Sequence, residues 1–404
     1  MKRIAIFCDG TWNLADLKDQ QTNVVRLAQA VETTASDGVK QVPLYIRGVG
    51  TGSGSNWFAR TSDKWFGGAF GWGLERNIET AYRQLIWLYE PGDEIYIFGF
   101  SRGAYTARSL AGLLRKAGIL RRANVDRVGE AMHLYRTRGE EGRPDAEDVL
   151  KEREALSPDV ATSMTEYIKR GDNPKLLEIS FLGVWDTVGS LGLPGLFGFI
   201  SKLNNQKYAF HDTELSSSVK SAYHAVALDE RRKAYPASLW GNLDRLNARA
   251  QQGERPYRQL WFAGDHGAVG GGGLARGLSA YTFGWIAKGA AAQGLEMRQD
   301  ILDEVKSERY AGDTLYKKKQ GLMSKVTLFL KDRGGPSKPE QVHESVLAKI
   351  HLGADNREGP YCPGSLAKVW NDLPGLLPPH PNAASSPSQS EDDEGKVAPQ
   401  TFSP

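Results

Sequence analysis

Residues 94–116 read EIYIFGFSRGAYTARSLAGLLRK, and this stretch decides the fold. Residues 94–100 form a nearly continuous apolar run, which predicts a strand that is buried on both faces. Residues 105–116 carry apolar side chains at helical spacing. The pentapeptide Gly99-Phe100-Ser101-Arg102-Gly103 joins the two, and G-x-S-x-G in this setting predicts a nucleophile elbow, a sharp turn that presents a reactive serine. The alternative is a plain strand–turn–helix connection whose serine only meets solvent.

Strand and helix patterns alternate on both sides of the elbow. The alternation predicts an α/β domain in which helices cover both faces of a mostly parallel sheet. Thr22 or Asn23 is a suitable N-cap for the first helix, and Pro43 places its strand at a sheet edge or at a strand start. The predicted strands span 2–8, 41–46, 94–100, 176–185 and 258–262, and the predicted helices span 22–34, 74–89, 105–116, 217–228 and 280–292.

Three segments depart from this alternation. Residues 120–173 are charged and helical in pattern, which predicts a helical insertion that lies over the sheet as a cap or lid. Residues 295–377 form a C-terminal accessory segment of a domain that we expect to span 1–377. Residues 378–404 are rich in Pro, Ser, Ala and acidic side chains, and this composition is too polar to fold alone. We therefore expect a disordered tail there.

The composition excludes several classes of protein. Hydrophobic residues make up 40% of the 404 and charged residues 25%, so a collagen-like, wholly disordered or membrane-embedded chain is excluded. Lys plus Arg is 51 against 48 for Asp plus Glu, which gives no support for nucleic-acid binding. Cys8 and Cys362 cannot form a disulfide framework in a chain of this size. The short apolar run 4–8 and the lack of any long one predict synthesis in the cytoplasm, without a signal peptide or a transmembrane segment.

A serine nucleophile needs a histidine base, and the base needs a carboxylate that fixes its tautomer. In hydrolases with this elbow the three follow in the order serine, acid, histidine. Among the histidines after Ser101, His266 follows the predicted strand 258–262 and opens a glycine-rich loop. Such a loop would let the imidazole swing across the sheet edge. His224 lies in a helical pattern and His380 in the Pro-rich tail, so a structural or surface role suits both better.

Asp186 is the best candidate for the carboxylate. It ends the apolar strand 176–185 and precedes a turn, which is where the third member of such a triad belongs. Asp229 and Glu230 instead follow a predicted helix and stand beside two arginines, which offer them ion pairs. Asp265 neighbours the candidate histidine, and adjacent side chains in an extended segment point apart. The alternative for Asp186 is a capping or turn role.

Backbone N–H groups for an oxyanion hole are expected from two places. One is the residue after the serine, Arg102, and the other is the loop after the strand beside the elbow strand. If the first predicted strand, residues 2–8, takes that neighbouring position, the loop supplies Gly10 and Thr11. Asp9, at the start of the loop, is better suited to hydrogen-bond the loop's own backbone. This chemistry requires no metal ion and no cofactor.

A glycine-rich stretch at 48–73 carries several aromatic residues. No Lys-Ser/Thr pair follows it, so a phosphate-binding loop is not favoured. We expect a substrate-binding lip that receives an acyl chain or touches a membrane surface. The alternative is that these rings pack in the core. The lip residues are Trp57, Phe58, Trp65 and Phe66.

Together the motifs resemble an uncharacterised α/β-hydrolase family that includes the catalytic domains of type VI secretion phospholipase effectors of the first lipase class. The matching stretches are 7–13 (FCDGTWN), 22–24 (TNV), 48–52 (GVGTG), 99–104 (GFSRGA), 185–189 (WDTVG), 227–232 (ALDERR) and the loop around His266. The resemblance implies a triad of Ser101, Asp186 and His266 that hydrolyses carboxylic esters, in the effectors those of phospholipids. The chain departs from the family at Ala268, where members often carry an acidic or amide side chain.

The resemblance also implies partners and a route of export. An effector of this kind acts on a lipid or other ester, contacts a membrane surface, and pairs with a secretion machine and an immunity protein. Export by a type VI secretion system is therefore an expectation that the resemblance adds. Two other functions stay open: hydrolysis of small non-lipid esters, and a catalytically degenerate hydrolase fold that serves as an interaction module.

Overall fold

The computed structural model describes residues 1–10, 21–48, 69–171, 174–188, 214–233, 235–251, 253–273, 275–313, 330–353 and 360–375. Several expectations from the sequence lie outside the described residues. These are Thr11, the lip residues Trp57, Phe58, Trp65 and Phe66, and the tail 378–404.

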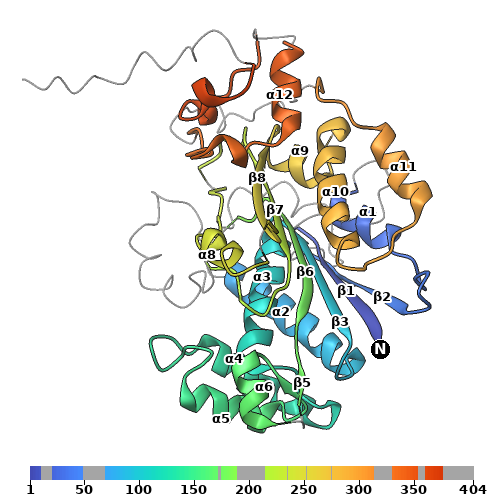
Figure 1. The fold of residues 1–404 in the computed structure, drawn as a ribbon, viewed down its shortest axis with the longest axis vertical. Helices are drawn as coiled ribbons and strands as arrows, with labels where there is room; N and C mark the ends of the chain where they lie inside the picture. The colour runs from blue at the N-terminus through green and yellow to red at the C-terminus, as the bar shows by residue number, and fades with distance from the viewer. Residues whose placement is uncertain are drawn as a thin grey trace, which may run out of the picture.

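A parallel sheet forms the centre of the molecule (Figure 1). Its strands are β1 Lys2–Cys8, β2 Lys40–Ile46, β3 Glu94–Phe100, β6 Ile179–Trp185, β7 Ala222–Ala227 and β8 Tyr257–Phe262. Among the described residues they lie in the order β2-β1-β3-β6-β7-β8, and every neighbouring pair is parallel. The elbow strand β3 therefore has β1 beside it, and the strand with Pro43 lies at an edge, as predicted.

Helices cover both faces of this sheet, as the alternation predicts (Figure 1). They are α1 Asn23–Ala30 and α10 Arg276–Ala291 on one face, and α2 Ala69–Leu88 and α3 Arg102–Ala117 on the other. Successive strand side chains point to opposite faces. Ile95 and Ile97 of β3 accordingly pack in the core with α2 and α3, whereas Tyr96 and Phe98 pack in the core with α1 and α10. Burial on both faces explains why β3 reads as a continuous apolar run.

One predicted helix is a strand. The helix expected over 217–228 is wrong, because its central part forms β7, which pairs with β6 and β8. Most side chains of β7 are buried, so its sequence shows no alternation of apolar and polar residues. A short apolar run of this kind fits helical spacing as well as a buried strand, and only tertiary pairing separates the two.

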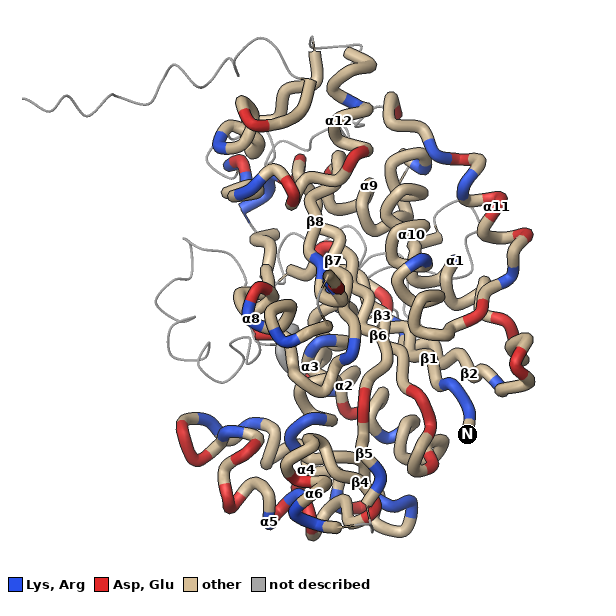
Figure 2. Tube along the Cα trace, in the orientation of Figure 1, with Lys and Arg blue, Asp and Glu red and all other residues tan. Residues whose placement is uncertain are grey.

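The segment expected as an insertion is mostly helical and carries charges of both signs (Figure 2). Its elements are a 3-10 helix at Arg122–Arg127, α4 Val128–Arg136, α5 Glu147–Leu156, β4 Val160–Ala161, α6 Met164–Arg170 and β5 Lys175–Leu176. Arg115 and Lys116, in the last turn of α3, hydrogen-bond to it. Ser101 lies at the other end of α3, about 24 Å away along 16 residues.

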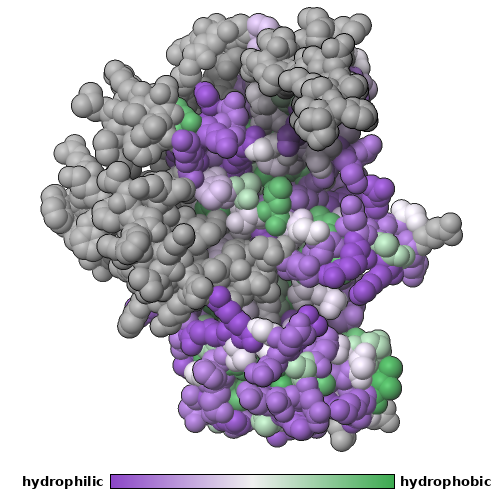
Figure 3. Space-filling model, turned by 90° about the vertical axis from the view of Figure 1, so that its left-hand side faces the viewer, coloured by the Kyte–Doolittle hydropathy of each residue, from purple (hydrophilic) through white to green (hydrophobic). Residues whose placement is uncertain are grey.

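The insertion therefore does not cover the end of the sheet at which Ser101 lies, and the expectation of a lid is corrected. It packs instead near the end where the strands begin (Figure 1). On the face that Figure 3 shows, this segment is mainly hydrophilic, with a few apolar residues. The local sequence predicts that this segment is helical. It does not predict which end of α3 the segment packs against.

The C-terminal part of the chain extends the core beyond β8. Trp261 of β8 packs with Val346, Leu366 and Val369, and its carbonyl accepts a hydrogen bond from the N–H of His343 at 3.0 Å. The remaining elements are α8 Leu243–Asn247, α9 His266–Gly270, α11 Gln299–Ser307, α12 Glu344–His351 and 3-10 turns at Pro339–Gln341, Gly364–Leu366 and Trp370–Asp372. None of the helices in the described ranges is both long and apolar enough to cross a membrane.

Candidate active site

Ser101 lies at the turn between β3 and α3. Its backbone has φ 59° and ψ −120°, a conformation that side-chain-bearing residues rarely adopt and that costs of order 1–3 kcal/mol. Two glycines make the turn possible. A Cβ on Gly103 would clash with the carbonyl oxygen of Cys8, and one on Gly99 would clash with the backbone of Gly103. The turn sets Ser101 at the N-terminus of α3, where the helix dipole favours negative charge.

His266 lies just beyond the end of β8, and its imidazole reaches Ser101. The distance from His266 Nε2 to Ser101 Oγ is 2.7 Å. His266 begins the short helix α9, whose N-cap Asp265 accepts a hydrogen bond from the N–H of Ala268 at 2.9 Å. The loop predicted here is thus a capped helical turn. The cap holds the backbone of this turn, and the hydrogen bonds to Ser101 and Asp186 hold the imidazole rather than letting it swing.

Asp186 directly follows β6 and contacts the far side of the same imidazole. Its Oδ2 lies 2.6 Å from His266 Nδ1, and its Oδ1 accepts a hydrogen bond from the N–H of Ala227 at 2.9 Å. The side chain is fully buried, and the backbone φ of 36° turns the chain at the strand tip. A carboxylate can only accept, so Nδ1 carries the proton and Nε2 is left to accept the proton of Ser101.

Arg333 contacts this carboxylate from the C-terminal segment. Its Nη1 lies 2.6 Å from Oδ1 of Asp186, and its Nη2 lies 3.0 Å from Oδ2. Burial raises the pKa of Asp186, but the charge of Arg333 and the hydrogen bonds from His266 and Arg333 outweigh burial and hold the pKa well below its usual range. Asp186 is therefore ionised at neutral pH. Sequence reasoning missed Arg333, because a lone arginine in the stretch KDRGGPS has no spacing that marks it.

Two aromatic rings and a second carboxylate surround His266. The ring centroid of Phe100 lies 4.6 Å from that of the imidazole, and the centroid of Tyr235 lies 5.1 Å away. Glu230 Oε2 accepts the backbone N–H of His266 at 3.3 Å and pairs with Arg232 at 2.6 Å. Burial raises the pKa of Glu230, but the hydrogen bonds and ion pair with Arg232 outweigh burial. The pKa of Glu230 is therefore lowered, and Glu230 is also ionised at neutral pH.

The other candidate side chains have partners away from Ser101. Asp229 Oδ2 accepts hydrogen bonds from a backbone N–H at 2.6 Å and from the hydroxyl of Tyr361 at 2.7 Å. His224 lies in β7 rather than in a helix. Its Nε2 accepts the N–H of Thr187 at 3.2 Å, and its Nδ1 bonds to the side chain of Gln259 at 3.0 Å. Both side chains are held by the scaffold, and neither contacts Ser101.

The three residues expected to form the oxyanion hole differ in what the structure describes. Arg102 is the first residue of α3, directly after the serine, and burial lowers the pKa of its guanidinium to about 10. The N–H of Gly10 donates to Oδ1 of Asp9 at 2.7 Å, so it points at that carboxylate. Asp9 thus binds a backbone N–H beside it, as predicted, and it also accepts hydrogen bonds from the hydroxyls of Thr22 and Tyr45. Thr11 lies outside the described residues.

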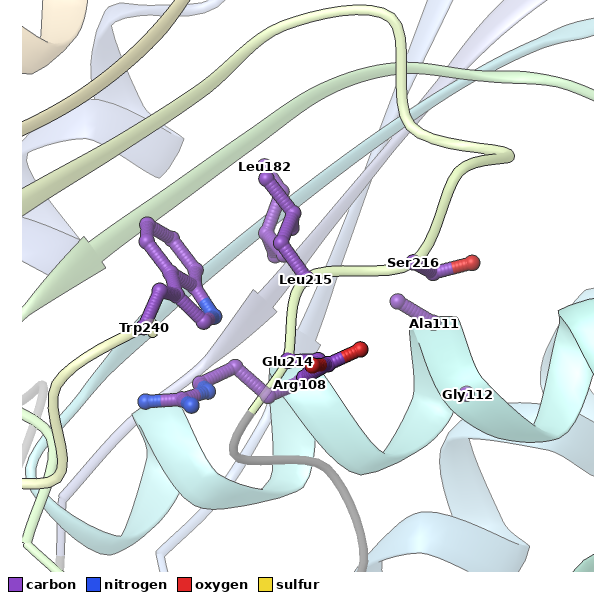
Figure 4. Close-up of a pocket in the computed structure, with 8 residues that line it drawn as sticks. All are labelled: Arg108, Ala111, Gly112, Leu182, Glu214, Leu215, Ser216 and Trp240. Atoms are coloured by element: carbon purple, nitrogen blue, oxygen red, sulfur yellow. The ribbon is translucent and has the colours of Figure 1, made fainter. Parts of the chain in front are cut away.

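A recess lies farther along α3, on the side of the sheet that α2 and α3 cover. The guanidinium of Arg108 lies 5.0 Å from the ring centroid of Trp240 at this recess (Figure 4). The lining residues are Arg108, Ala111, Gly112, Leu182, Glu214, Leu215, Ser216 and Trp240. None of Ser101, Asp186 and His266 lines it, so the recess is separate from the three hydrogen-bonded side chains.

Several known proteins are similar to this chain over part of its length. The uncharacterised protein YEL023C of Saccharomyces cerevisiae is 32% identical over 163 residues, which are 40% of this chain and 21% of the yeast protein. The chain thus spans about a fifth of that relative. A crystal structure of an uncharacterised protein from Pseudomonas aeruginosa matches 76% of this chain and 48% of its own at 16% identity and a TM-score of 0.39. The structure of the Tle1 effector bound to the VgrG spike of the type 6 secretion system matches 67% of this chain and 50% of its own. The identity is 18% and the TM-score is 0.33.

A family match covers most of the chain. Residues 2–289 match the model of the catalytic domain of the Tle1-like phospholipase effectors of type VI secretion systems. The matched range includes the elbow, the strand that ends at Asp186 and the helical turn that begins at His266, and it ends before the accessory segment 295–377. This chain belongs to the Tle1-like phospholipase effector family, through its catalytic domain.

Proposed function

We propose that this chain is a serine hydrolase that cleaves carboxylic esters, and that its substrates are acyl esters of phospholipids, as for a phospholipase A. The observation that carries the proposal is the series of hydrogen bonds from Ser101 through His266 to Asp186, at 2.7 and 2.6 Å. A serine on a strained elbow, with an oriented imidazole and a buried carboxylate behind it, is the arrangement that acyl transfer needs. Membership of a phospholipase effector family supports the lipid substrate.

The proposed reaction runs in two halves. Ser101 Oγ attacks the ester carbonyl carbon while His266 Nε2 takes the hydroxyl proton, and Asp186 stabilises the imidazolium. His266 then gives that proton to the leaving alcohol, and the acyl group stays on Ser101. A water molecule attacks the acyl-enzyme, with His266 again as the base, and releases the carboxylic acid.

The charge that develops on the carbonyl oxygen needs N–H donors. We assign one to Arg102, which follows the nucleophile at the start of α3. For the second we favour Thr11 over Gly10, because the N–H of Gly10 is bound to Asp9. The lip residues named above are proposed to receive the acyl chain and to touch the membrane.

The test compares substrates and one variant. The purified protein is incubated with phosphatidylcholine vesicles and with p-nitrophenyl esters of short and long acyl chains. We expect fatty acid release from the vesicles and a preference for long chains, with a loss of about 10³-fold or more in Ser101→Ala. Activity on short esters alone would favour the small-ester hydrolase. A folded protein without activity on any ester would favour the interaction module.

We also propose a biological setting, which rests on the family alone. The chain would be exported by a type VI secretion system, in contact with a spike protein of the VgrG kind and neutralised by an immunity protein in the producing cell. Toxicity after delivery to the periplasm, relieved by a co-encoded neighbour, would support this setting. We further propose that residues 1–377 form one hydrolase unit followed by the tail 378–404, which limited proteolysis would release.

A further inference from the structure

The segment that carries Arg333 is tied to the sequence just after β7. Leu330 forms an antiparallel bridge with Arg232, and the N–H of Lys331 donates to the carbonyl of Arg231 at 2.8 Å. Asp332 pairs with Arg231 at 2.8 Å on the surface. These contacts direct the next residue inward, and the side chain of Arg333 is only 7% exposed.

The guanidinium of Arg333 bridges three parts of the site. It donates to both oxygens of Asp186, from Nη1 at 2.6 Å and from Nη2 at 3.0 Å. The same two nitrogens donate to the carbonyls of Ala227 at 2.9 Å and Tyr235 at 2.7 Å. With the hydrogen bonds from His266 and Ala227, each oxygen of Asp186 accepts two hydrogen bonds. The plane of the carboxylate is therefore fixed.

We infer that Arg333 is a positioning residue for ester hydrolysis, supplied by the C-terminal segment, which holds the Asp186 carboxylate in the orientation that His266 requires. This inference rests on the proposed function of the same site. A planar, bidentate fork suits the task, since it fixes direction as well as charge. Arg333 lies beyond residue 289, where the family match ends, so the group that holds Asp186 comes from outside the matched range.

A purely structural role is the competing explanation. A buried carboxylate needs a counter-charge, and removing one partner of a buried pair destabilises a protein whatever its activity. The two explanations differ in what happens to the Asp186–His266 pair. Arg333 places a positive charge beside the pair, and this charge opposes protonation of the pair as a unit. Loss of that charge makes protonation of the pair easier.

Other charged or titratable groups lie around the pair. Glu230 faces the backbone of His266 and is paired with Arg232. His224 lies on the neighbouring strand, and burial lowers its pKa to about 3, so it stays neutral across the range of interest. Asp265 caps α9. Tyr235 presents its ring to His266. Two of these groups also feel Arg333 directly, since its charge contributes to the lowered pKa of His224 and its Nη2 donates to the carbonyl of Tyr235.

The experiment uses the full chain with three variants. Arg333→Met removes both the bidentate guanidinium and its charge, whereas Arg333→Lys removes the bidentate group but keeps the charge. Asp332→Asn breaks only the surface ion pair of the same segment. We expect Arg333→Met to lower kcat about 10- to 100-fold with little change in KM, by analogy with the outer groups that orient metal-bound histidines. We also expect the acid limb of its pH profile to move to higher pH by about one unit or more. Arg333→Lys should lower kcat and leave the acid limb in place, and Asp332→Asn should behave as wild type.

A second readout does not depend on turnover. The proton on His266 Nδ1, hydrogen-bonded to Asp186, gives a downfield proton resonance, which we expect to move in Arg333→Met and Arg333→Lys but not in Asp332→Asn. If the wild type hydrolyses no ester while the resonance still moves, the proposed function fails and the positioning role stands. Wild-type kcat, acid limb and resonance in folded Arg333→Met would overturn the inference. If Arg333→Met does not fold, wild-type kcat and resonance in Arg333→Lys would overturn it instead.

Discussion

Asp186 is the residue at which the strand tip, the imidazole and the C-terminal segment meet. Its carboxylate is ionised, fully buried and bound to His266 Nδ1 at 2.6 Å. Asp186→Asn keeps the shape but puts an amide donor in place of one acceptor, which disfavours the tautomer with the proton on Nδ1. We expect kcat to fall by up to about 10⁴-fold at neutral pH. Steady-state ester hydrolysis by the folded variant checks this, and near-normal turnover would show that another carboxylate serves His266.

Asp229 provides the matched control and a prediction of its own. Burial raises its pKa to about 6, against about 3.9 in an unfolded chain. As the pH rises the unfolded chain loses this proton first, so the stability of the folded state falls between about pH 4 and pH 6, by at most about 3 kcal/mol. Asp229→Asn does not titrate. The free energy of unfolding of Asp229→Asn, measured relative to that of the wild type, should therefore increase as the pH rises from 4 to 7.

Urea unfolding of both proteins at several pH values measures this difference. A gap in unfolding free energy that stays constant from pH 4 to pH 7 would contradict the raised pKa of Asp229. The variant should keep its ester hydrolysis, because Asp229 contacts Tyr361 and not the imidazole. An inactive but folded Asp229→Asn would point to Asp229 rather than Asp186 as the carboxylate of the triad.

At the scale of elements, the elbow depends on how closely α3 approaches β1. A Cβ on Gly103 would clash with the backbone oxygens at the end of β1, and those oxygens cannot move without shifting the strand. Gly103→Ala should therefore lower the unfolding free energy by about 1–3 kcal/mol and reduce hydrolysis by displacing Ser101. Gly129→Ala in α4, where a Cβ meets open space, should instead be neutral or stabilise by up to about 1 kcal/mol. Thermal melts of the two variants compare them, and equal melting temperatures would contradict tight packing at the elbow.

Elements with a strong local pattern could be predicted from the sequence, and elements set by tertiary contacts could not. The elbow and the strand ends that carry Asp186 and His266 follow from apolar runs that stop at polar residues. The strand β7 could not be told from a helix, because it is buried on both faces. The glycines around His266 predict a loop, whereas the turn is a short helix capped by Asp265. Arg333 is 147 residues from Asp186 in the sequence, and no local pattern predicts that contact.

A lipid-binding aromatic lip would govern how the whole molecule meets a membrane. If Trp57, Phe58, Trp65 and Phe66 meet lipid, replacing all four by Ser should weaken action on vesicles far more than action on a short soluble ester. Interfacial binding scales with buried apolar area, at about 25 cal/mol per Å², whereas the three hydrogen-bonded side chains are untouched. A stable variant with equal activity on both substrates would remove the membrane lip. A large fall in melting temperature with both activities lost would show that these rings belong to the core.

Ester hydrolysis at this site requires that Ser101 be a nucleophile activated by His266. The most direct measurement is labelling of the folded protein with a fluorophosphonate, followed by mass spectrometry of its peptides. We predict a single adduct on Ser101, no adduct in Ser101→Ala, and strongly slowed labelling when His266 is replaced by Gln. A folded wild-type protein that resists the probe, or that carries the adduct on another residue, would contradict the claim.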